Sequence, residues 1–75
     1  MKYTVSWTET SFHQLKTLDK VVAERVIAKV ETISEMPFRY VKPLKRFDLY
    51  ILRVGEYRVI MSIERRKMII FVLEI

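Results

Sequence analysis

Two arginines, Arg53 and Arg58, stand on either side of the only glycine of the chain, Gly55. Apolar and polar residues alternate before and after Gly55-Glu56, which predicts two antiparallel strands joined by a two-residue turn. With that turn, Arg53 lies directly across from Arg58. Like charges in that position destabilise a sheet, and the planar fork of a guanidinium group suits phosphate. The pair therefore predicts a site for an anion or for the carboxylates of a partner.

The same two side chains also fit a purely structural role. Either arginine can form an ion pair with an acidic side chain of the chain itself. The candidates are Asp48, Glu56 and Glu64. A three-residue loop at Gly55 would also break the pairing of Arg53 with Arg58. The sequence leaves these alternatives open, although internal carboxylates are found more easily for one arginine than for both.

Residues 37–47 form a second group of basic side chains, in a segment that we interpret as a connection. Its basic residues are Arg39, Lys42, Lys45 and Arg46. Such a series can follow a phosphate backbone, so we predict these four as RNA-binding residues, with a solvated surface loop as the alternative. Aromatic residues among them either stack on bases or form the rim of the core. These are Tyr40, Phe47 and Tyr50.

The charge of the chain is segregated. Residues 1–35 hold five basic and five acidic side chains, whereas residues 36–75 hold nine basic and four acidic ones and carry the whole net charge of +5. This distribution favours a polyanion or an acidic protein as the partner of the second half. Solubility alone is the alternative.

The sequence lacks the residues that several classes of function require. The chain has no cysteine and one histidine, His13, which we expect on the surface. It has no phosphate-binding glycine loop and no metal-ligand spacing, so we predict neither a metal site nor a small-molecule cofactor. No apolar run approaches the roughly 18 residues of a membrane span, and we expect a cytoplasmic protein. The length of 75 residues predicts one domain, 1–75.

Hydrophobic spacing predicts the elements that position the arginines. We expect a strand over 2–6, a helix capped by Thr8, a second helix capped by Asp19 and ended by Pro37, and strands near 48–54, 57–64 and 67–74. The helical stripes are Phe12, Leu15 and Leu18, then Val22, Val26, Val30 and Ile33. The order β-α-α-β-β-β predicts an α+β fold, in which a helical hairpin packs on one face of a small antiparallel sheet.

The predicted hairpin has two different faces. One face is apolar and is the natural core face under the helices, with Tyr50, Leu52, Val54, Tyr57, Val59 and Met61. The other is half apolar and carries both arginines, with Leu49, Ile51, Arg53, Arg58, Ile60 and Ser62. The sequence therefore predicts that the arginines face away from the core.

Three segments in this order resemble the RelE/ParE superfamily of small toxins from type II toxin–antitoxin modules. They are Val5-Ser6-Trp7-Thr8, Lys42-Pro43-Leu44-Lys45 and, most specifically, Leu52-Arg53-Val54-Gly55-Glu56-Tyr57-Arg58-Val59-Ile60. The resemblance runs over nearly the whole chain. It implies a RelE-like fold and a cognate antitoxin that wraps the toxin.

The RelE branch of this superfamily implies cleavage of mRNA on the ribosome by basic residues rather than by a metal. Arg58 matches the arginine of a Tyr-Arg motif that contacts the scissile phosphate region, and Arg53 matches a frequent arginine before the turn. We therefore expect both as catalytic residues. Lys42 and Lys45 match a basic loop that helps to bind RNA. Arg46 and Arg39 are predicted as RNA-binding residues only because they belong to the same basic segment of this chain.

The sequence also departs from the RelE pattern. RelE-type enzymes carry lysines on the strand before the turn, where Leu49 and Ile51 stand here. They also continue past the last strand into a segment with a further arginine and often a tyrosine, whereas this sequence ends at Glu74-Ile75. We therefore expect weak or absent cleavage. Three interpretations remain: an mRNA-cleaving toxin, an inactive relative that binds an antitoxin, and a ParE-like toxin directed at DNA gyrase.

Overall fold

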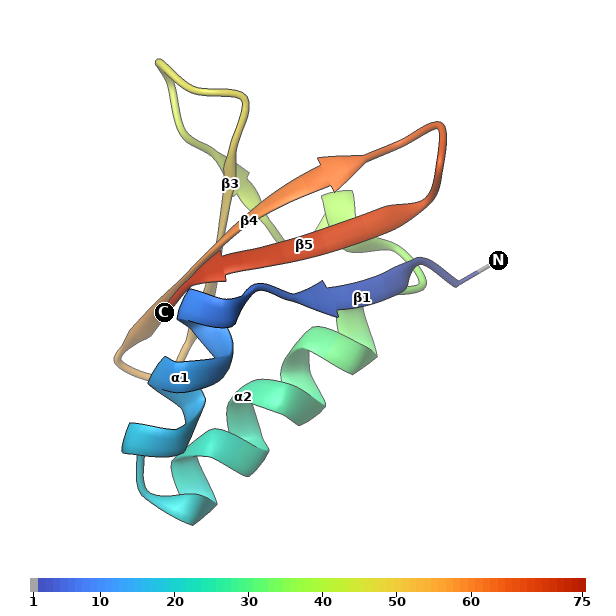
Figure 1. Ribbon diagram of the computed structural model, residues 1–75. Coiled ribbons are helices and arrows are strands. Elements are labelled where there is room, and N and C mark those ends of the chain that lie inside the picture. Colours follow the sequence, from blue (N-terminus) through green and yellow to red (C-terminus); the bar gives the residue numbers. More distant parts are fainter. Residues whose placement is uncertain (1) are drawn as a thin grey trace.

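Two helices lie against one face of a sheet that has five strands within the part of the chain described by the computed structural model, residues 2–75 (Figure 1). The elements are β1 (Thr4–Trp7), α1 (Glu9–Thr17), α2 (Lys20–Ile33), a 3-10 turn η1 (Pro37–Arg39), β2 (Lys42–Pro43), β3 (Tyr50–Val54), β4 (Tyr57–Glu64) and β5 (Ile69–Glu74). This order confirms the predicted α+β arrangement. It adds one short strand, β2, inside the basic connection.

The strands lie in the order β1-β5-β4-β3-β2. The antiparallel β3-β4-β5 meander confirms the expected pairing of the last three strands. The first strand differs, because β1 runs parallel to β5, with Thr4 beside Ile69 and Trp7 beside Val72. The sheet is therefore mixed rather than wholly antiparallel. Both helices and the strands β2, β3 and β4 lie between β1 and β5 in the sequence. No short turn joins β1 to β5, so the local sequence does not predict that these two strands run parallel.

A polar cap fixes α1 to the sheet. The Thr8 hydroxyl accepts a hydrogen bond from the Ser11 N–H at 3.2 Å, which confirms Thr8 as the N-cap. The buried Ser11 hydroxyl donates to the Val72 carbonyl of β5 at 2.8 Å. The start of the helix and the last strand are thereby joined through one pair of side chains.

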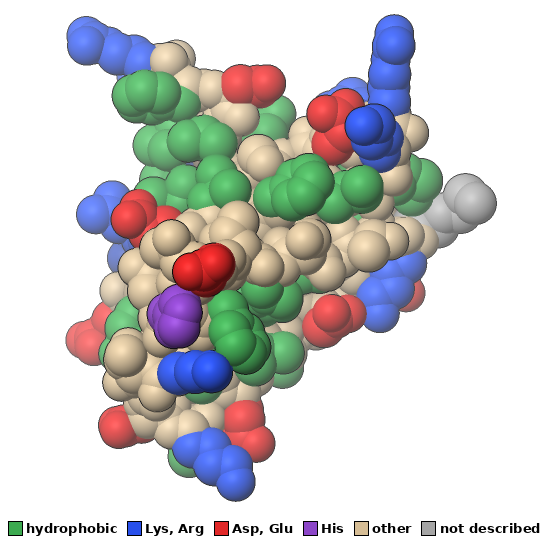
Figure 2. Space-filling model, in the orientation of Figure 1, with side chains coloured by type: hydrophobic (Ala, Val, Ile, Leu, Met, Phe, Trp, Pro, Cys, Tyr) green, Lys and Arg blue, Asp and Glu red, His purple; other side chains and the backbone are tan. Residues whose placement is uncertain are grey.

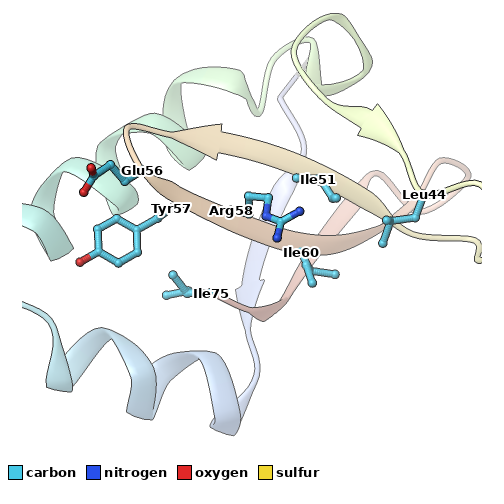
Figure 3. Close-up of a pocket in the computed structure, with 7 residues that line it drawn as sticks. All are labelled: Leu44, Ile51, Glu56, Tyr57, Arg58, Ile60 and Ile75. Carbon is cyan, nitrogen blue, oxygen red and sulfur yellow. The ribbon is translucent and has the colours of Figure 1, made fainter.

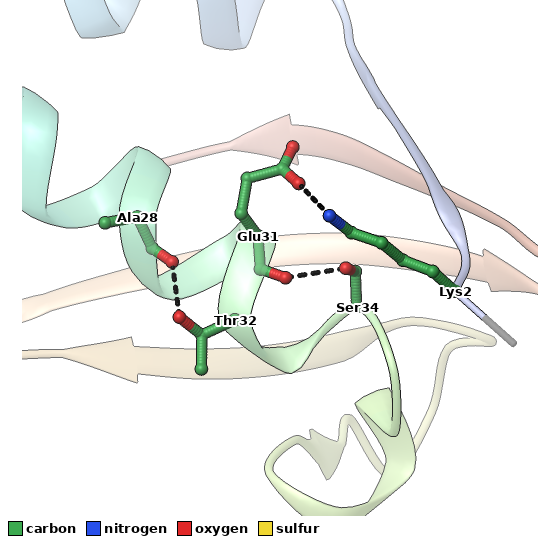
Figure 4. A network of polar contacts seen from close by, with 5 residues as sticks. All are labelled: Lys2, Ala28, Glu31, Thr32 and Ser34. Atoms are coloured by element: carbon green, nitrogen blue, oxygen red, sulfur yellow. Dashed lines mark hydrogen bonds and ion pairs between the residues drawn. The ribbon is translucent and has the colours of Figure 1, made fainter.

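The ends of α2 differ from the prediction. Asp19 occupies the N-cap position, but its side chain makes no capping hydrogen bond. The helix ends at Ile33, with Ser34 as its C-cap, and Pro37 instead begins η1. The last turn is closed locally, because the Ser34 hydroxyl donates to the Glu31 carbonyl at 2.6 Å and the Thr32 hydroxyl donates to the Ala28 carbonyl at 2.9 Å (Figure 4).

The core lies between the helices and the sheet. It is built from Leu15, Val26, Val30, Ile33, Leu52, Val54, Val59, Met61, Ile70 and Val72. This confirms the stripe of α2 and most of the core face of the hairpin. Two predicted core residues are wrong: Phe12 is 49% exposed and Tyr57 is 37% exposed. Phe12 turns outward because the sheet-facing side of α1 is Ser11, Leu15 and Leu18. Tyr57 lies next to the β3–β4 turn and borders an open hollow beside α2, together with Val22 and Arg25.

Neither helix within residues 2–75 has the length and the apolar content that a membrane crossing requires. The one histidine, His13, is exposed on α1, as expected.

Candidate functional site

The β3–β4 hairpin places the two arginines opposite each other. Its turn consists of Gly55 and Glu56, with Gly55 at a φ of +59°, a conformation that favours glycine. The register pairs Val54 with Tyr57 and Arg53 with Arg58. The two-residue turn predicted from the sequence is therefore confirmed, and the alternative three-residue loop is not formed.

Both arginines are exposed and have no acidic partner in residues 2–75. The ion pair that this part of the chain does form involves neither arginine and joins Lys2 to Glu31 at 3.2 Å (Figure 4). The predicted alternative, in which internal carboxylates neutralise Arg53 or Arg58, is not realised. Two guanidinium groups on neighbouring strands thus keep their charge and their donors for an external group.

The face of the sheet away from the helices is hollowed beside the arginines. One hollow of about 250 Å³ is lined by Lys42, Ile51, Arg53 and Arg58. Lys42 belongs to β2 and pairs with Ile51, which brings it onto the same face as the two arginines. The structure therefore gathers three predicted site residues around one hollow.

A second hollow of about 380 Å³ adjoins the first through Arg58 and Ile51 (Figure 3). Its lining consists of Leu44, Ile51, Glu56, Tyr57, Arg58, Ile60 and Ile75. In Figure 3 the Arg58 side chain lies along the sheet beside Ile51 and Ile60. An aliphatic floor of this kind keeps water away from one side of the guanidinium group, which strengthens its attraction for an anion.

The other predicted RNA-binding residues lie apart from this cluster. Lys45 and Arg46 are exposed in the loop between β2 and β3, which projects beyond the sheet and is closed by a hydrogen bond from the Leu44 N–H to the Leu49 carbonyl at 3.0 Å (Figure 1). Arg39 lies on η1 and borders a different hollow, together with Tyr3 and Met36. The six predicted site residues thus form one cluster of three and two outlying groups.

Two basic residues of α2, Arg25 and Lys29, lie beside Arg53 but were not predicted as site residues. Arg25 and Lys29 border a hollow of about 480 Å³ that also contains Arg53. Their spacing of four residues, beside the apolar stripe of α2, was visible in the sequence. The sequence alone does not show that this side of α2 lies beside the β3–β4 turn.

Figure 2 shows the surface in the orientation of Figure 1. Hydrophobic side chains gather over the strands, and Lys and Arg side chains project from the two upper corners. No three His, Cys, Asp or Glu side chains within residues 2–75 come together as metal ligands.

The structure is thus a small α+β protein with an open basic face, and comparisons with known proteins show its family. Residues 5–75 match the profile of the family described as the ParE toxin of the type II toxin–antitoxin system. The chain belongs to this family, within the RelE/ParE superfamily of toxins. No curated protein matches the chain.

Solved structures similar to this chain include toxin–antitoxin complexes. The RelBE2 complex from Mycobacterium tuberculosis has a chain that superposes with a TM-score of 0.92 at 27% identity, over 99% of this chain and 95% of that one. The RelE–RelB complex from Pyrococcus horikoshii gives a TM-score of 0.84 at 27% identity, over 99% and 92%.

The RelBE complex from E. coli gives a TM-score of 0.81 at 21% identity, over 96% of this chain and 92% of that one, and shares the fold. The profile and the structures agree on a toxin of a type II system. The family profile is named for the ParE branch, whereas the solved structures are named for the RelE branch, so these comparisons do not distinguish the two branches.

Proposed function

We propose that this toxin acts on RNA, as a RelE-like inhibitor of translation that cleaves mRNA on the ribosome in the cytoplasm. The observation that carries the proposal is the pair of Arg53 and Arg58, which face each other on the open side of the sheet without a carboxylate partner in residues 2–75. Lys42 borders the same hollow. Three cations at one point suit a phosphodiester better than a neutral ligand.

The proposed chemistry is charge stabilisation and positioning. When the 2′-hydroxyl of a ribose attacks the neighbouring phosphorus, it gives its proton to water, and the bond to the 5′-oxygen of the next nucleotide breaks. The 5′-oxygen leaves with a proton from water, a 2′,3′-cyclic phosphate forms, and negative charge builds on the phosphoryl oxygens on the way. Arg58 and Arg53 donate hydrogen bonds to those oxygens, and removing one such donor costs about 10²–10³ in rate. Lys42 holds the substrate near them. The ribosome supplies the alignment of the RNA.

The outlying basic residues have a supporting role in this proposal. Lys45, Arg46 and Arg39 contact RNA at a distance from the cleaved bond and contribute affinity through phosphate charge. Leu49 and Ile51 stand where RelE-type enzymes carry lysines, so we expect slow cleavage.

The proposal includes a cognate antitoxin as the protein partner. Both structures at 27% identity are complexes of a RelE-type toxin with its antitoxin. An inactive relative that only binds an antitoxin would share this partner but would not cut RNA.

A second candidate is a ParE-like toxin whose target is DNA gyrase. It is favoured by one observation, the ParE description of the matched family. In that case the open face contacts a protein rather than a phosphodiester, and Arg58 contributes little to inhibition.

Primer extension on mRNA in a translating extract tests the proposal. The extract receives the purified protein, its Arg58→Gln variant, or an Arg66→Gln control that loses the same charge at the exposed β4–β5 turn. We expect discrete cuts with the wild type and the control, and at least 100-fold slower cutting with Arg58→Gln.

Two other results contradict the proposal. Uncut mRNA together with intact antitoxin binding indicates an inactive relative. Loss of DNA supercoiling by purified gyrase, equal for wild type and Arg58→Gln, indicates the ParE-like alternative.

A further inference from the structure

The candidate site continues around the edge of β3. The short strand β2 pairs with only Tyr50 and Ile51 of β3, so the edge of β3 at Arg53 has no neighbouring strand. Arg53 borders the open-face hollow with Arg58 and Lys42, and it also borders the hollow of about 480 Å³ beside α2. One side chain is therefore shared by two basic surfaces that lie on either side of the same edge.

The α2 hollow carries charge of one sign. It is lined by Arg25, Ala28, Lys29, Thr32, Arg53, Val54 and Gly55, which include three cations and no carboxylate. The helical period explains this segregation. Arg25 and Lys29 are four residues apart and Thr32 follows three residues later, so these three form one stripe, whereas Glu24 and Glu31 lie on the neighbouring stripe that contains Ala28. The acidic residues of α2 thus leave the hollow uniformly basic.

An exposed aromatic ring lies next to this hollow. The Lys29 ammonium group is 5.7 Å from the centroid of the Tyr40 ring, and Tyr40 is 48% exposed. A base can stack on such a ring, and stacking on an aromatic side chain contributes about 1–3 kcal/mol per base in proteins that bind single strands. An acidic peptide would use the cations but would gain less from the exposed ring.

We propose that Arg25, Lys29 and Tyr40 form a second binding segment for single-stranded RNA, continuous with Arg53 and Arg58. The phosphates next to the one held on the open face pass over the β3 edge at Arg53 and lie against Arg25 and Lys29. A neighbouring base stacks on Tyr40. This inference rests on the proposed function and extends it, because it assigns the substrate a stretch of several nucleotides rather than a single phosphodiester.

Salt-dependent RNA binding tests this segment. Fluorescein-labelled oligouridylates of three and ten nucleotides are titrated with the protein at several salt concentrations, and binding is measured by fluorescence anisotropy. The variant is Arg25→Gln with Lys29→Gln. Its control is Arg66→Gln with Lys67→Gln, which removes the same charge at the exposed β4–β5 turn, at the opposite end of β4 from the hairpin turn.

The α2 variant should lose two phosphate contacts on the ten-nucleotide RNA. Each contact contributes about 0.7 to the slope of log K against log salt for a single strand, so we expect the slope to fall by about 1.4. The affinity at 0.1 M salt should fall by about 25-fold. The three-nucleotide RNA should bind both proteins alike, and the control should keep the wild-type slope.

The stacking role of Tyr40 is tested in the same assay. Tyr40→Phe keeps an aromatic face and should bind the ten-nucleotide RNA as the wild type does. Tyr40→Ala should weaken it by tenfold or more. Equal binding by the two variants would remove Tyr40 from the segment.

Three results would overturn the inference. Equal losses for the α2 variant and the control would show that only net charge matters. An equal loss on three-nucleotide RNA would place Arg25 and Lys29 at the central phosphate. Unchanged RNA binding with a lost affinity for the antitoxin would assign the hollow to an acidic protein segment.

Failure of the proposed function gives a different pattern. If Arg53→Gln with Arg58→Gln leaves RNA binding unchanged while the α2 variant weakens it, the open-face site is wrong and the α2 segment remains.

Discussion

The two faces of the β3–β4 hairpin have opposite chemistry although they share the same strands. On the covered face Leu52 is 1% exposed and Val59 is fully buried, and both pack in the common core. On the open face Arg53 and Arg58 face each other across the same pair of strands, with no carboxylate partner in residues 2–75. The covered face stabilises the fold, whereas the open face holds a like-charge pair that opposes it. Such a conflict with local stability is typical of a functional surface.

The largest expected difference between the faces is in the free energy of unfolding. Leu52→Ala should lower it by about 2–5 kcal/mol, because a buried leucine leaves a cavity in a closely packed core. Arg53→Gln, one residue further along, should not lower it and should raise it by no more than about 1 kcal/mol, because it removes one member of the like-charge pair. Urea unfolding followed by circular dichroism measures both. Similar losses in the two variants would mean that the faces do not differ in this way.

The next largest change in the free energy of unfolding is expected at the turn that joins β3 to β4. Gly55→Ala should destabilise the protein by about 1–2 kcal/mol, because Gly55 has a φ of +59° and alanine is strained there. A Cβ atom at this position would meet nothing within 4 Å, so the cost comes from the backbone and not from crowding. Gly55→Asn is the control and should lose less, since asparagine tolerates this conformation. Thermal unfolding distinguishes the two variants, and equal losses would contradict a backbone origin of the cost.

The open face should show a smaller effect of the opposite sign. Arg58→Gln removes one member of the like-charge pair, so the free energy of unfolding should rise by about 0.2–1 kcal/mol. The rise should shrink as salt screens the repulsion. Urea unfolding at low and high salt measures it. A loss of stability would mean that Arg58 has a stabilising partner within the protein.

The smallest effect is expected at the ion pair between Lys2 and Glu31. Both side chains are about half exposed, at 55% and 49%. Lys2→Gln should therefore lower the free energy of unfolding by no more than about 0.5 kcal/mol, and less at high salt. Lys2→Gln should thus lower the free energy of unfolding, whereas Arg58→Gln should raise it, and urea unfolding at low and high salt detects this difference in sign. A loss above about 1 kcal/mol would show that this pair anchors β1 to α2.

Local patterns predicted the hairpin and the pairing of its two arginines well. The two-residue turn at Gly55 fixes the register, so the pairing of Arg53 with Arg58 followed from the sequence. The helical stripe likewise predicted the burial of Val26 and Val30. Each of these features depends on residues that are close together in the chain.

Features that depend on distant segments were not predictable. The parallel direction of β1 depends on β5, at the far end of the sequence. The basic residues of 37–47 are neighbours in sequence, yet only Lys42 joins the arginines, because it alone lies on the short strand that pairs with β3. Arg25 and Lys29 could be recognised only once α2 was placed beside the hairpin turn. The assignment of these residues to RNA remains a prediction.

The interior position of β5 in the sheet has a consequence for how the protein is made. β5 lies between β1 and β4 and supplies Ile70 and Val72 to the core. A nascent chain that has not yet exposed residues 69–74 therefore leaves β1 without a neighbouring strand and leaves the start of α1 without its Val72 anchor. Contacts that span almost the whole chain form late and slow down folding. The toxin fold is thus completed only after residues 69–74 have been synthesised, and the ribosome that produces it handles an unfinished sheet until then.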